Sequence, residues 1–356
     1  MRRIRVTQQI LDVAKLYHDD MVLQEAKRLK KYQPQVNLQE LHDKIVPVGT
    51  PIRITTVKPA RNRARQTRIA TDDERDKYQR YVTLVMEKLN NCLLKARVSE
   101  FNDIIDDFRA ILHEDEVSVP ISIGGDAWSS LAERIVDAMQ YDSVRKYFFP
   151  KYVGMIDGLK SCVYCNANYS VTDKQGRGYY DLDHWKPKSI YPYLCLCFFN
   201  LQPTCASCNR HKSADEREYM GLYEDDTAKD LAVMKLRVTP LSRLLYYLTH
   251  DVNELEIKYE PCDTAYQRMR DVMQDKLHIE EIYQQHKDVA EEVLWKHMAY
   301  NKSYRNAANI TFGSKRILSK HEINRFILGT YDSPDDVHRR PMTQLIQDLA
   351  KDLGML

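Results

Sequence analysis

The chain has 356 residues, with 53 Lys and Arg against 51 Asp and Glu, so its formal charge is only +2. This near balance excludes a uniformly basic nucleic-acid coat, and any such surface must be local. With 43% hydrophobic and 29% charged residues, the composition is that of a globular protein long enough for one large or two modest domains, and it excludes overall disorder.

No segment approaches the roughly 18 consecutive apolar residues of a transmembrane helix. Near the start of the chain, Asp12 and Lys15 fall inside what would be the apolar core of a signal peptide. We therefore expect a cytoplasmic protein without a membrane partner.

Residues 1–150 are expected to form a helical N-terminal region, because apolar residues recur there at three- and four-residue spacing. One such face runs through residues 101–112. A second helix is expected over residues 128–139, after the turn signal Gly124-Gly125. We expect both to be core helices without chemistry.

Residues 51–70 form a basic arm with six Lys or Arg residues and no acid. One interpretation is an arm that contacts phosphates. The other is a solvated loop whose charge is balanced by the acids of residues 72–76. We carry the first interpretation forward. The arginines proposed to contact nucleic acid are Arg61, Arg63, Arg65 and Arg68.

The composition changes between about residues 155 and 220, where Cys, Asn, Tyr and Pro concentrate, and we assign residues 151–225 to a separate module. Four of the eight cysteines lie here in two CxxC pairs, Cys162 with Cys165 and Cys205 with Cys208. Each pair presents two thiolates from one tight turn, and four thiolates suit a tetrahedral Zn²⁺. The alternatives are unrelated buried thiols or redox pairs.

The predicted zinc is structural, because four protein ligands leave no position open for water. It would close the 39 residues between the pairs into a folded-back loop. Within that loop lie Asp181, Asp183, His184 and Asn200, and Asn209 directly follows the second pair. An Asp-His pair alone is most often a surface turn or a core histidine with hydrogen-bond partners. The downstream asparagines make a functional site the better interpretation.

The order of these motifs resembles that of the HNH, or ββα-metal, endonucleases. The resemblance rests on CxxC, then DH with Pro187 three residues after the histidine, then Asn200-Leu201, then CxxCN with Lys212 three residues after Asn209. The run DHWKPKSIYPYL…FFNLQPTCASCNRHKS is similar to a bacterial branch found in anti-phage systems, including the nuclease subunit of Septu-type systems.

The resemblance implies a role for each residue of the motif. Asp183 and Asn209 would hold one Mg²⁺ or Mn²⁺ ion, which prefers oxygen ligands. His184 would be the general base that activates a water molecule. Asn200 would brace the loop that bears His184 through hydrogen bonds to the backbone. The implied reaction is hydrolysis of a phosphodiester bond, with DNA favoured over RNA.

Two positions leave alternatives open. His211 could replace Asn209 as a ligand, but Asn209 and Lys212 lie three residues apart on one helical face, whereas His211 points elsewhere. In a strand, Asp181 faces the same way as Asp183. Asp181 is therefore either a supporting acid behind the ligands or a substitute ligand.

Basic residues around this site are candidates for contacts with backbone phosphates. They are Lys212, Arg210, Lys188 and Lys186, of which the last is equally well explained as an ordinary solvated side chain. The flanking segments contain no base-reading motif, so we expect little sequence specificity.

Residues 226–356 are expected to form a helical C-terminal region. Its pattern predicts a strand at residues 255–259, amphipathic helical segments such as 277–297, and a helix through residues 342–353. The predicted fold class is therefore mainly α, with a small central ββα-metal module stapled by zinc.

Together with this resemblance, the sequence predicts a metal-dependent HNH endonuclease, and the resemblance implies a role in anti-phage defence. Its rivals are a zinc-organised module that binds nucleic acid without cutting it, a structural subunit with a decayed nuclease module, and an RNA nuclease of the tRNA-cutting type. Neither non-catalytic rival needs Asp183, His184 and Asn209 together, and all three are present.

A partner is also expected, because the sequence has no P-loop that could act as an internal nucleotide switch. The resemblance implies a separate sensor subunit, an ATPase, that docks on the helical flanks. The alternative is that these flanks form the core of a stand-alone enzyme.

Overall fold

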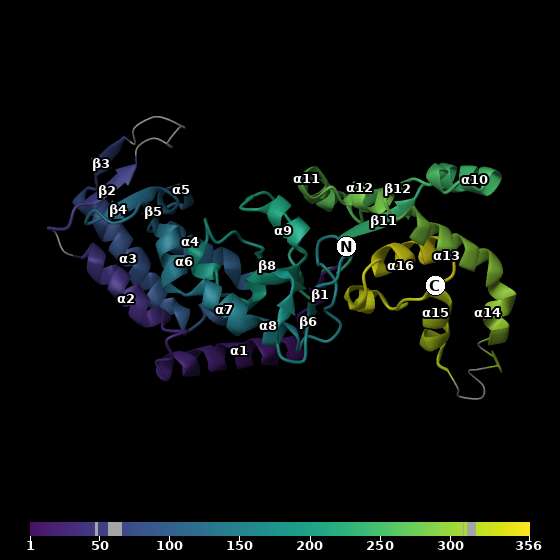
Figure 1. Cartoon of the computed structure of the whole chain (residues 1–356), viewed down its shortest axis with the longest axis horizontal. Helices are drawn as coiled ribbons and strands as arrows, with labels where there is room; N and C mark the ends of the chain where they lie inside the picture. The colour runs from purple at the N-terminus through teal and green to yellow at the C-terminus, as the bar shows by residue number, and fades with distance from the viewer. Residues whose placement is uncertain (47–48, 56–65, 309, 312–317) are drawn as a thin grey trace.

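The computed structural model describes residues 1–46, 49–55, 66–308, 310–311 and 318–356. The fold is mixed: about 53% of these described residues are helical, and the strands form small sheets. An N-terminal set of helices, a central segment with short strands and a C-terminal set of helices follow one another along the long axis of the molecule (Figure 1).

The N-terminal region is mainly helical, as its periodicity predicts. The helix expected over residues 128–139 begins at Leu131, where Ser130 caps the first turn. The region's helices are α1 (Gln8–Ala26), α2 (Pro34–Ile45), α3 (Asp72–Leu89), α4 (Phe101–Arg109), α5 (Glu114–Val117), α6 (Leu131–Ala138), α7 (Tyr141–Tyr147) and α8 (Phe149–Val153).

A four-stranded antiparallel sheet in this region was not predicted from the sequence. Its strand order is β3-β2-β4-β5, with bounds β2 (Ile52–Thr55), β3 (Thr67–Ile69), β4 (Pro120–Ile123) and β5 (Ser129–Ser130). The two ends of the basic arm form β2 and β3. In β2 the alternation buries Ile52 and Ile54 and exposes Arg53 between them. Residues 56–65 lie outside the described residues.

The central segment places two strands directly before a helix. Strands β8 (Asp181–His184) and β9 (Leu201–Thr204) pair antiparallel, with Asp183 opposite Gln202, and α9 (Ala206–Lys212) begins two residues after β9. A smaller antiparallel pair, β6 (Val171–Thr172) and β7 (Gly178–Tyr179), precedes them. This order of strand, strand and helix is the one that the resemblance implies.

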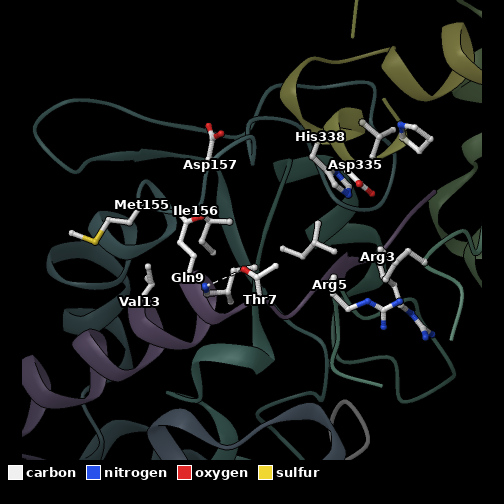
Figure 2. A pocket seen from close by; sticks show the side chains of 15 residues that line it. Arg3, Arg5, Thr7, Gln9, Val13, Met155, Ile156, Asp157, Asp335 and His338 are labelled. Carbon is white, nitrogen blue, oxygen red and sulfur yellow. Dashed lines mark hydrogen bonds between the residues drawn. The ribbon is translucent and has the colours of Figure 1, made fainter. Parts of the chain in front are cut away.

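The start of the chain packs on the central segment. Strand β1 (Ile4–Arg5) pairs in parallel with β10 (Tyr223–Glu224), and His338 Nε2 donates to the carbonyl oxygen of Arg2 over 2.8 Å. A pocket of about 510 Å³ lies beside β1, and Figure 2 shows residues of the first turns of α1 on one side of it and Asp335 and His338 on the other. Segments distant in sequence therefore meet at this point.

The C-terminal region confirms the predicted strand and final helix with small shifts. The strand expected at 255–259 spans 257–261. The segment 277–297 contains two helices separated at Gln285 and His286, and the left-handed backbone of His278 separates the first of them from the helix that precedes it. The elements are β11 (Met234–Val238), α10 (Pro240–Thr249), β12 (Ile257–Pro261), α11 (Gln267–Leu277), α12 (Ile279–Gln284), α13 (Lys287–Ala299), α14 (Lys302–Ala308), α15 (Lys320–Leu328) and α16 (Thr343–Asp352). Within the described ranges, no helix has the length and apolar composition needed to span a bilayer.

Candidate metal centre and the adjoining polar site

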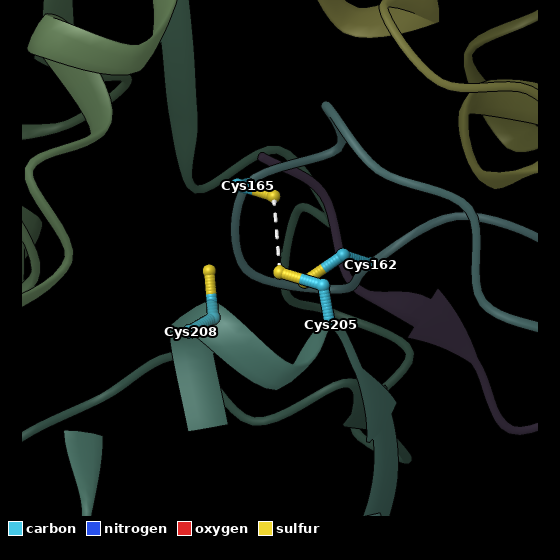
Figure 3. A group of neighbouring side chains, drawn as sticks. All are labelled: Cys162, Cys165, Cys205 and Cys208. Atoms are coloured by element: carbon cyan, nitrogen blue, oxygen red, sulfur yellow. Dashed lines mark hydrogen bonds between the residues drawn. The ribbon is translucent and has the colours of Figure 1, made fainter. Parts of the chain in front are cut away.

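The four cysteines of the two CxxC pairs converge at one buried point (Figure 3). Their Sγ atoms all lie within 4.8 Å of one another, and the Sγ atoms of Cys165 and Cys205 are 3.9 Å apart. In a tetrahedral site with Zn–S bonds of ~2.3 Å, neighbouring sulfurs lie about 3.8 Å apart. The donor atoms and their spacing therefore fit zinc, and the cluster could hold such an ion.

The local chain supplies hydrogen bonds to these sulfurs. The amide of Ala167 donates to Cys165 Sγ over 3.4 Å, and Asn168 Nδ2 lies 3.6 Å from Cys205 Sγ. Hydrogen bonds from the neighbouring thiols lower the pKa of Cys205, the residue directly before the first turn of α9. Such donors favour the thiolate form that a metal requires.

The buried cysteines outside the cluster have a different character. Burial raises the pKa of Cys195 and of Cys197 to about 12, so both are neutral thiols at physiological pH. In the described part of the chain, the four-cysteine cluster is the only group of three or more Cys, His, Asp or Glu side chains close enough to share an ion.

Next to this cluster, Asp183 forms a buried ion pair with Lys212. The Lys212 ammonium lies 3.1 Å from the carboxylate and also donates to the carbonyl oxygen of His184 over 2.7 Å. Tyr164, which lies inside the first CxxC turn, donates its hydroxyl to Asp183 Oδ2 over 2.6 Å. Burial raises the pKa of Asp183, and the charge of Lys212 opposes this shift. The acid is thus fully engaged by groups of this chain.

The side chain of Asn209 contacts Asp181 and not Asp183. The resemblance implies a different arrangement, in which Asn209 and Asp183 lie together as ligands of one ion. Asn209 Nδ2 donates to Asp181 Oδ2 over 3.1 Å, and both side chains are half-buried. Three residues advance a helix by about 4.5 Å, and two residues advance a strand by about 6.6 Å. The long side chain of Lys212 spans the difference and so reaches Asp183, while the shorter Asn209 reaches only Asp181.

Lys212 therefore cannot make the phosphate contact that the sequence analysis predicts for it. A phosphate contact requires an accessible ammonium, but Lys212 is only 1% exposed. Its partners Asp183 and His184 hold it inside the module. The prediction missed this because the helical face of Lys212 gives its direction but not whether a buried acid lies opposite.

His184 is buried and electrically neutral. Its burial, together with the positive charge of Lys188, lowers the pKa of the imidazole to about 3. Its Nε2 lies 3.0 Å from the carbonyl oxygen of Cys195, and because a carbonyl only accepts, Nε2 carries the hydrogen. The basic lone pair is then on Nδ1. The ring packs against Tyr141, with 4.7 Å between the ring centroids.

Asn200 braces the loop between the two strands. Its Oδ1 accepts from the amide of Lys186 over 2.7 Å, and its Nδ2 donates to the carbonyl oxygens of Lys186 and Leu194 over 3.0 and 3.1 Å. Lys186 follows β8 closely, so these bonds fix the chain just after His184. The contacts are those that the resemblance implies for this residue.

The remaining basic candidates differ in accessibility. Arg210 is exposed on α9, and Lys188 places its ammonium 4.2 Å from the centroid of the Tyr141 ring. Lys186 is half-buried, with its ammonium 5.0 Å from the centroid of the Trp185 ring. In the basic arm, Arg68 pairs with Glu74 over 2.7 Å. The other proposed arginines, Arg61, Arg63 and Arg65, lie outside the described residues.

Two buried polar residues of the site were missed by sequence reasoning. Gln202 donates to the Tyr164 hydroxyl, and its Oε1 accepts from the amide of Leu222 over 2.9 Å. Tyr164 lies between Cys162 and Cys165, and Gln202 lies in the run FFNLQPTC. The only sequence signal for either residue is a polar side chain among apolar neighbours and cysteines. The two residues link the cysteine cluster to Asp183.

Comparison of the chain with protein-family models, with curated proteins and with solved structures finds no match in any of the three.

Proposed function

We propose that this chain is a metal-dependent endonuclease that hydrolyses the phosphodiester backbone of nucleic acid, with DNA the favoured substrate. The observation that supports this most is the grouping on β8 and α9. The carboxylates of Asp181 and Asp183 and the amide of Asn209 lie beside the four-cysteine cluster, and the neutral imidazole of His184 is the next side chain along β8. A binding surface alone has no use for this combination.

The oxygen donors best placed for a divalent ion are those of Asp181 and Asn209, because the Asp183 carboxylate already accepts from Lys212 and Tyr164. Asn209 turns its Nδ2 toward Asp181, and rotation of the amide by 180° presents Oδ1 there instead. A bound Mg²⁺ or Mn²⁺ would supply charge neutralisation at the scissile phosphate. In this proposal Asp181 is the substitute ligand, and Asp183 positions Lys212 and the strand.

His184 is proposed to accept the proton of the attacking water at Nδ1. The carbonyl of Cys195 holds the ring from the opposite nitrogen, and Asn200 holds the chain that follows. Lys188 and Arg210 are proposed to contact flanking phosphates, which would position the nucleic acid without selecting a base sequence.

The direct test is incubation of the purified chain with plasmid, linear DNA and total RNA in Mg²⁺, Mn²⁺ or EDTA. We expect cutting of DNA that needs a divalent ion and is lost in Asn209→Ala. The matched control is Arg217→Ala, an exposed residue beyond α9. Cutting that persists in EDTA, or no cutting under any condition, contradicts the proposal.

A second candidate is a zinc-organised module that binds nucleic acid without cutting it. The buried Asp183–Lys212 pair and the low pKa of His184 favour it, because both reduce the reactivity of groups that a nuclease uses. This candidate expects a gel shift that persists in EDTA, that no metal converts into cleavage, and that Asn209→Ala leaves intact.

The proposal also includes a role in anti-phage defence and control by a separate ATPase subunit, as the resemblance implies. Isolation of the chain together with the products of neighbouring genes tests this part. We expect co-elution with an ATPase and weak cutting by the isolated chain. Elution alone with full cutting activity contradicts the partner and leaves the nuclease proposal standing.

A further inference from the structure

Helix α10 turns its apolar side to solvent. Leu241, Leu244, Leu245 and Leu248 are 68%, 55%, 37% and 72% exposed, while Ser242 and Tyr246 are the residues that the helix buries. A surface helix ordinarily buries its apolar stripe and exposes its polar one. The leucine stripe, as we call these four residues, is therefore an apolar surface that the fold itself does not cover.

The helix is held firmly without the leucines. Thr239 caps its first turn, Pro240 occupies the first position, and His250 ends it in a left-handed conformation. Tyr246 accepts a hydrogen bond from Trp295 Nε1 over 2.7 Å, which fixes α10 on α13. The exposed leucines are thus available for a contact with another molecule. Figure 1 shows α10 at the outer end of the C-terminal region, on the side away from the central segment.

The spacing of the stripe reads the same in both directions. Its positions are separated by three, one and three residues, so the pattern is symmetric about the midpoint between Leu244 and Leu245. In an antiparallel contact about a two-fold axis at that midpoint, Leu241 of one copy meets Leu248 of the other. An isologous interface requires this self-complementarity.

The charges beside the stripe are also compatible with a second copy. Arg243 lies on α10, and Glu254 lines the groove beside Leu241 and Leu245. In the part of the chain that the structure describes, neither side chain has an ion-pair partner. The surface beside the leucine stripe thus carries one positive and one negative side chain. Such a surface can form ion pairs with a second copy of itself, whereas a partner of strongly positive or strongly negative charge would be repelled by one of the two.

We propose that α10 is the interface of a symmetric homodimer, in which two leucine stripes pack antiparallel. A helix of ten residues is about 15 Å long, so this contact falls below the roughly 800 Å² per partner of a standard stable interface, even with Trp295 at its edge. The dimer is therefore expected to be weak and reversible.

Sedimentation of the full chain over a range of concentrations tests the proposal. The mass should rise from monomer toward dimer, and Leu244→Asp should raise the dissociation constant at least tenfold because two carboxylates then meet at the axis. The control is Leu23→Asp, which changes a leucine of α1 that is 48% exposed. A chain that stays monomeric into the high micromolar range, as it would if a different protein covers α10, overturns the proposal. A dimer unaffected by Leu244→Asp also overturns it.

Cross-linking tests the antiparallel direction. In a background that replaces the accessible thiols, Cys92→Ser with Cys262→Ser, a short bismaleimide should join Leu241→Cys chains to Leu248→Cys chains when the two are mixed. Each variant alone should give little product. Efficient joining of Leu241→Cys chains to one another indicates a parallel contact and overturns the two-fold arrangement.

Discussion

The Lys212 ammonium lies 3.1 Å from the Asp183 carboxylate, and the two side chains are 0% and 4% exposed. Removal of one partner leaves the other charge buried and uncompensated, which costs about 3–5 kcal/mol of unfolding free energy in such pairs. We expect that loss for Lys212→Met and for Asp183→Leu, and a smaller loss for the double variant. Urea unfolding measures each value. A single variant within about 1 kcal/mol of the parent excludes the pair.

The cysteine cluster predicts one zinc ion per chain. Cys205→Ser should abolish the bound zinc and lower the melting temperature, because the seven-residue helix α9 has little stability of its own. Elemental analysis of the purified variants measures the zinc. Cys197→Ser, a buried cysteine outside the cluster, is the matched control and should keep its zinc. Retention of zinc by Cys205→Ser would rule out the assigned ligand set.

Under the proposed function, His184→Ala should lower the cleavage rate by a factor of about 10² to 10⁴, as expected when a general base is lost. His211→Ala, which changes an exposed histidine on α9, should cut at the parent rate. Zinc content and circular dichroism establish that both variants are folded. A normal rate for folded His184→Ala would remove the histidine from the mechanism.

The basic arm is tested by salt dependence. If Arg61, Arg63 and Arg65 contact phosphates, changing all three to Gln should reduce the slope of log affinity against log salt by roughly 0.7 to 0.9 per contact. Arg68→Gln is the control, because this arginine pairs with Glu74 and should contribute little. An unchanged slope in the triple variant assigns the arm to a role other than phosphate contact.

Acid should destabilise the chain through His338. Burial lowers the pKa of this imidazole to about 4, whereas in the unfolded chain it is ~6.5. Below pH ~6.5 the unfolded state binds more protons, so unfolding free energy falls as the pH drops toward 4, by up to about 3 kcal/mol. His184 contributes with the same sign. In urea unfolding at several pH values, the unfolding free energy should fall less steeply with decreasing pH for His338→Gln than for the control His211→Gln. Equal slopes for the two variants would show that His338 is not the source of the acid destabilisation.

Local motifs accounted for the parts of the site that local geometry determines. The CxxC spacing places the sulfurs, the alternation in residues 181–184 places both acids on one side of β8, and the three-residue spacing places Asn209 and Lys212 on one face of α9. The bracing contacts of Asn200 also agree with the motif. Within each CxxC pair, along β8 and along α9 the residues concerned lie at most three positions apart, and the contacts of Asn200 span at most 14 positions.

The features that sequence reasoning missed depend on distant partners. Asn209 contacts Asp181 and not Asp183 because of the length of its side chain and the way in which α9 packs on β8. The burial of Lys212 is decided by the segments packed around it. The four-stranded sheet joins β2 to β4, whose residues are more than 60 positions apart, so no window of periodicity contains both strands. Such pairings are tertiary choices that a local pattern does not encode.

The pairing of β1 with β10 has a consequence for biosynthesis. Residues 4 and 5 leave the ribosome long before their partners, residues 223 and 224. At translation rates of about 5–20 residues per second, the first strand waits on the order of ten to forty seconds without its neighbour. The N-terminal helices can collapse during that time, but the seam between the beginning of the chain and its middle closes only after most of the protein has been made. Nascent chains arrested before residue 223 should therefore expose their first residues to proteases, and chains arrested well beyond that point should protect them.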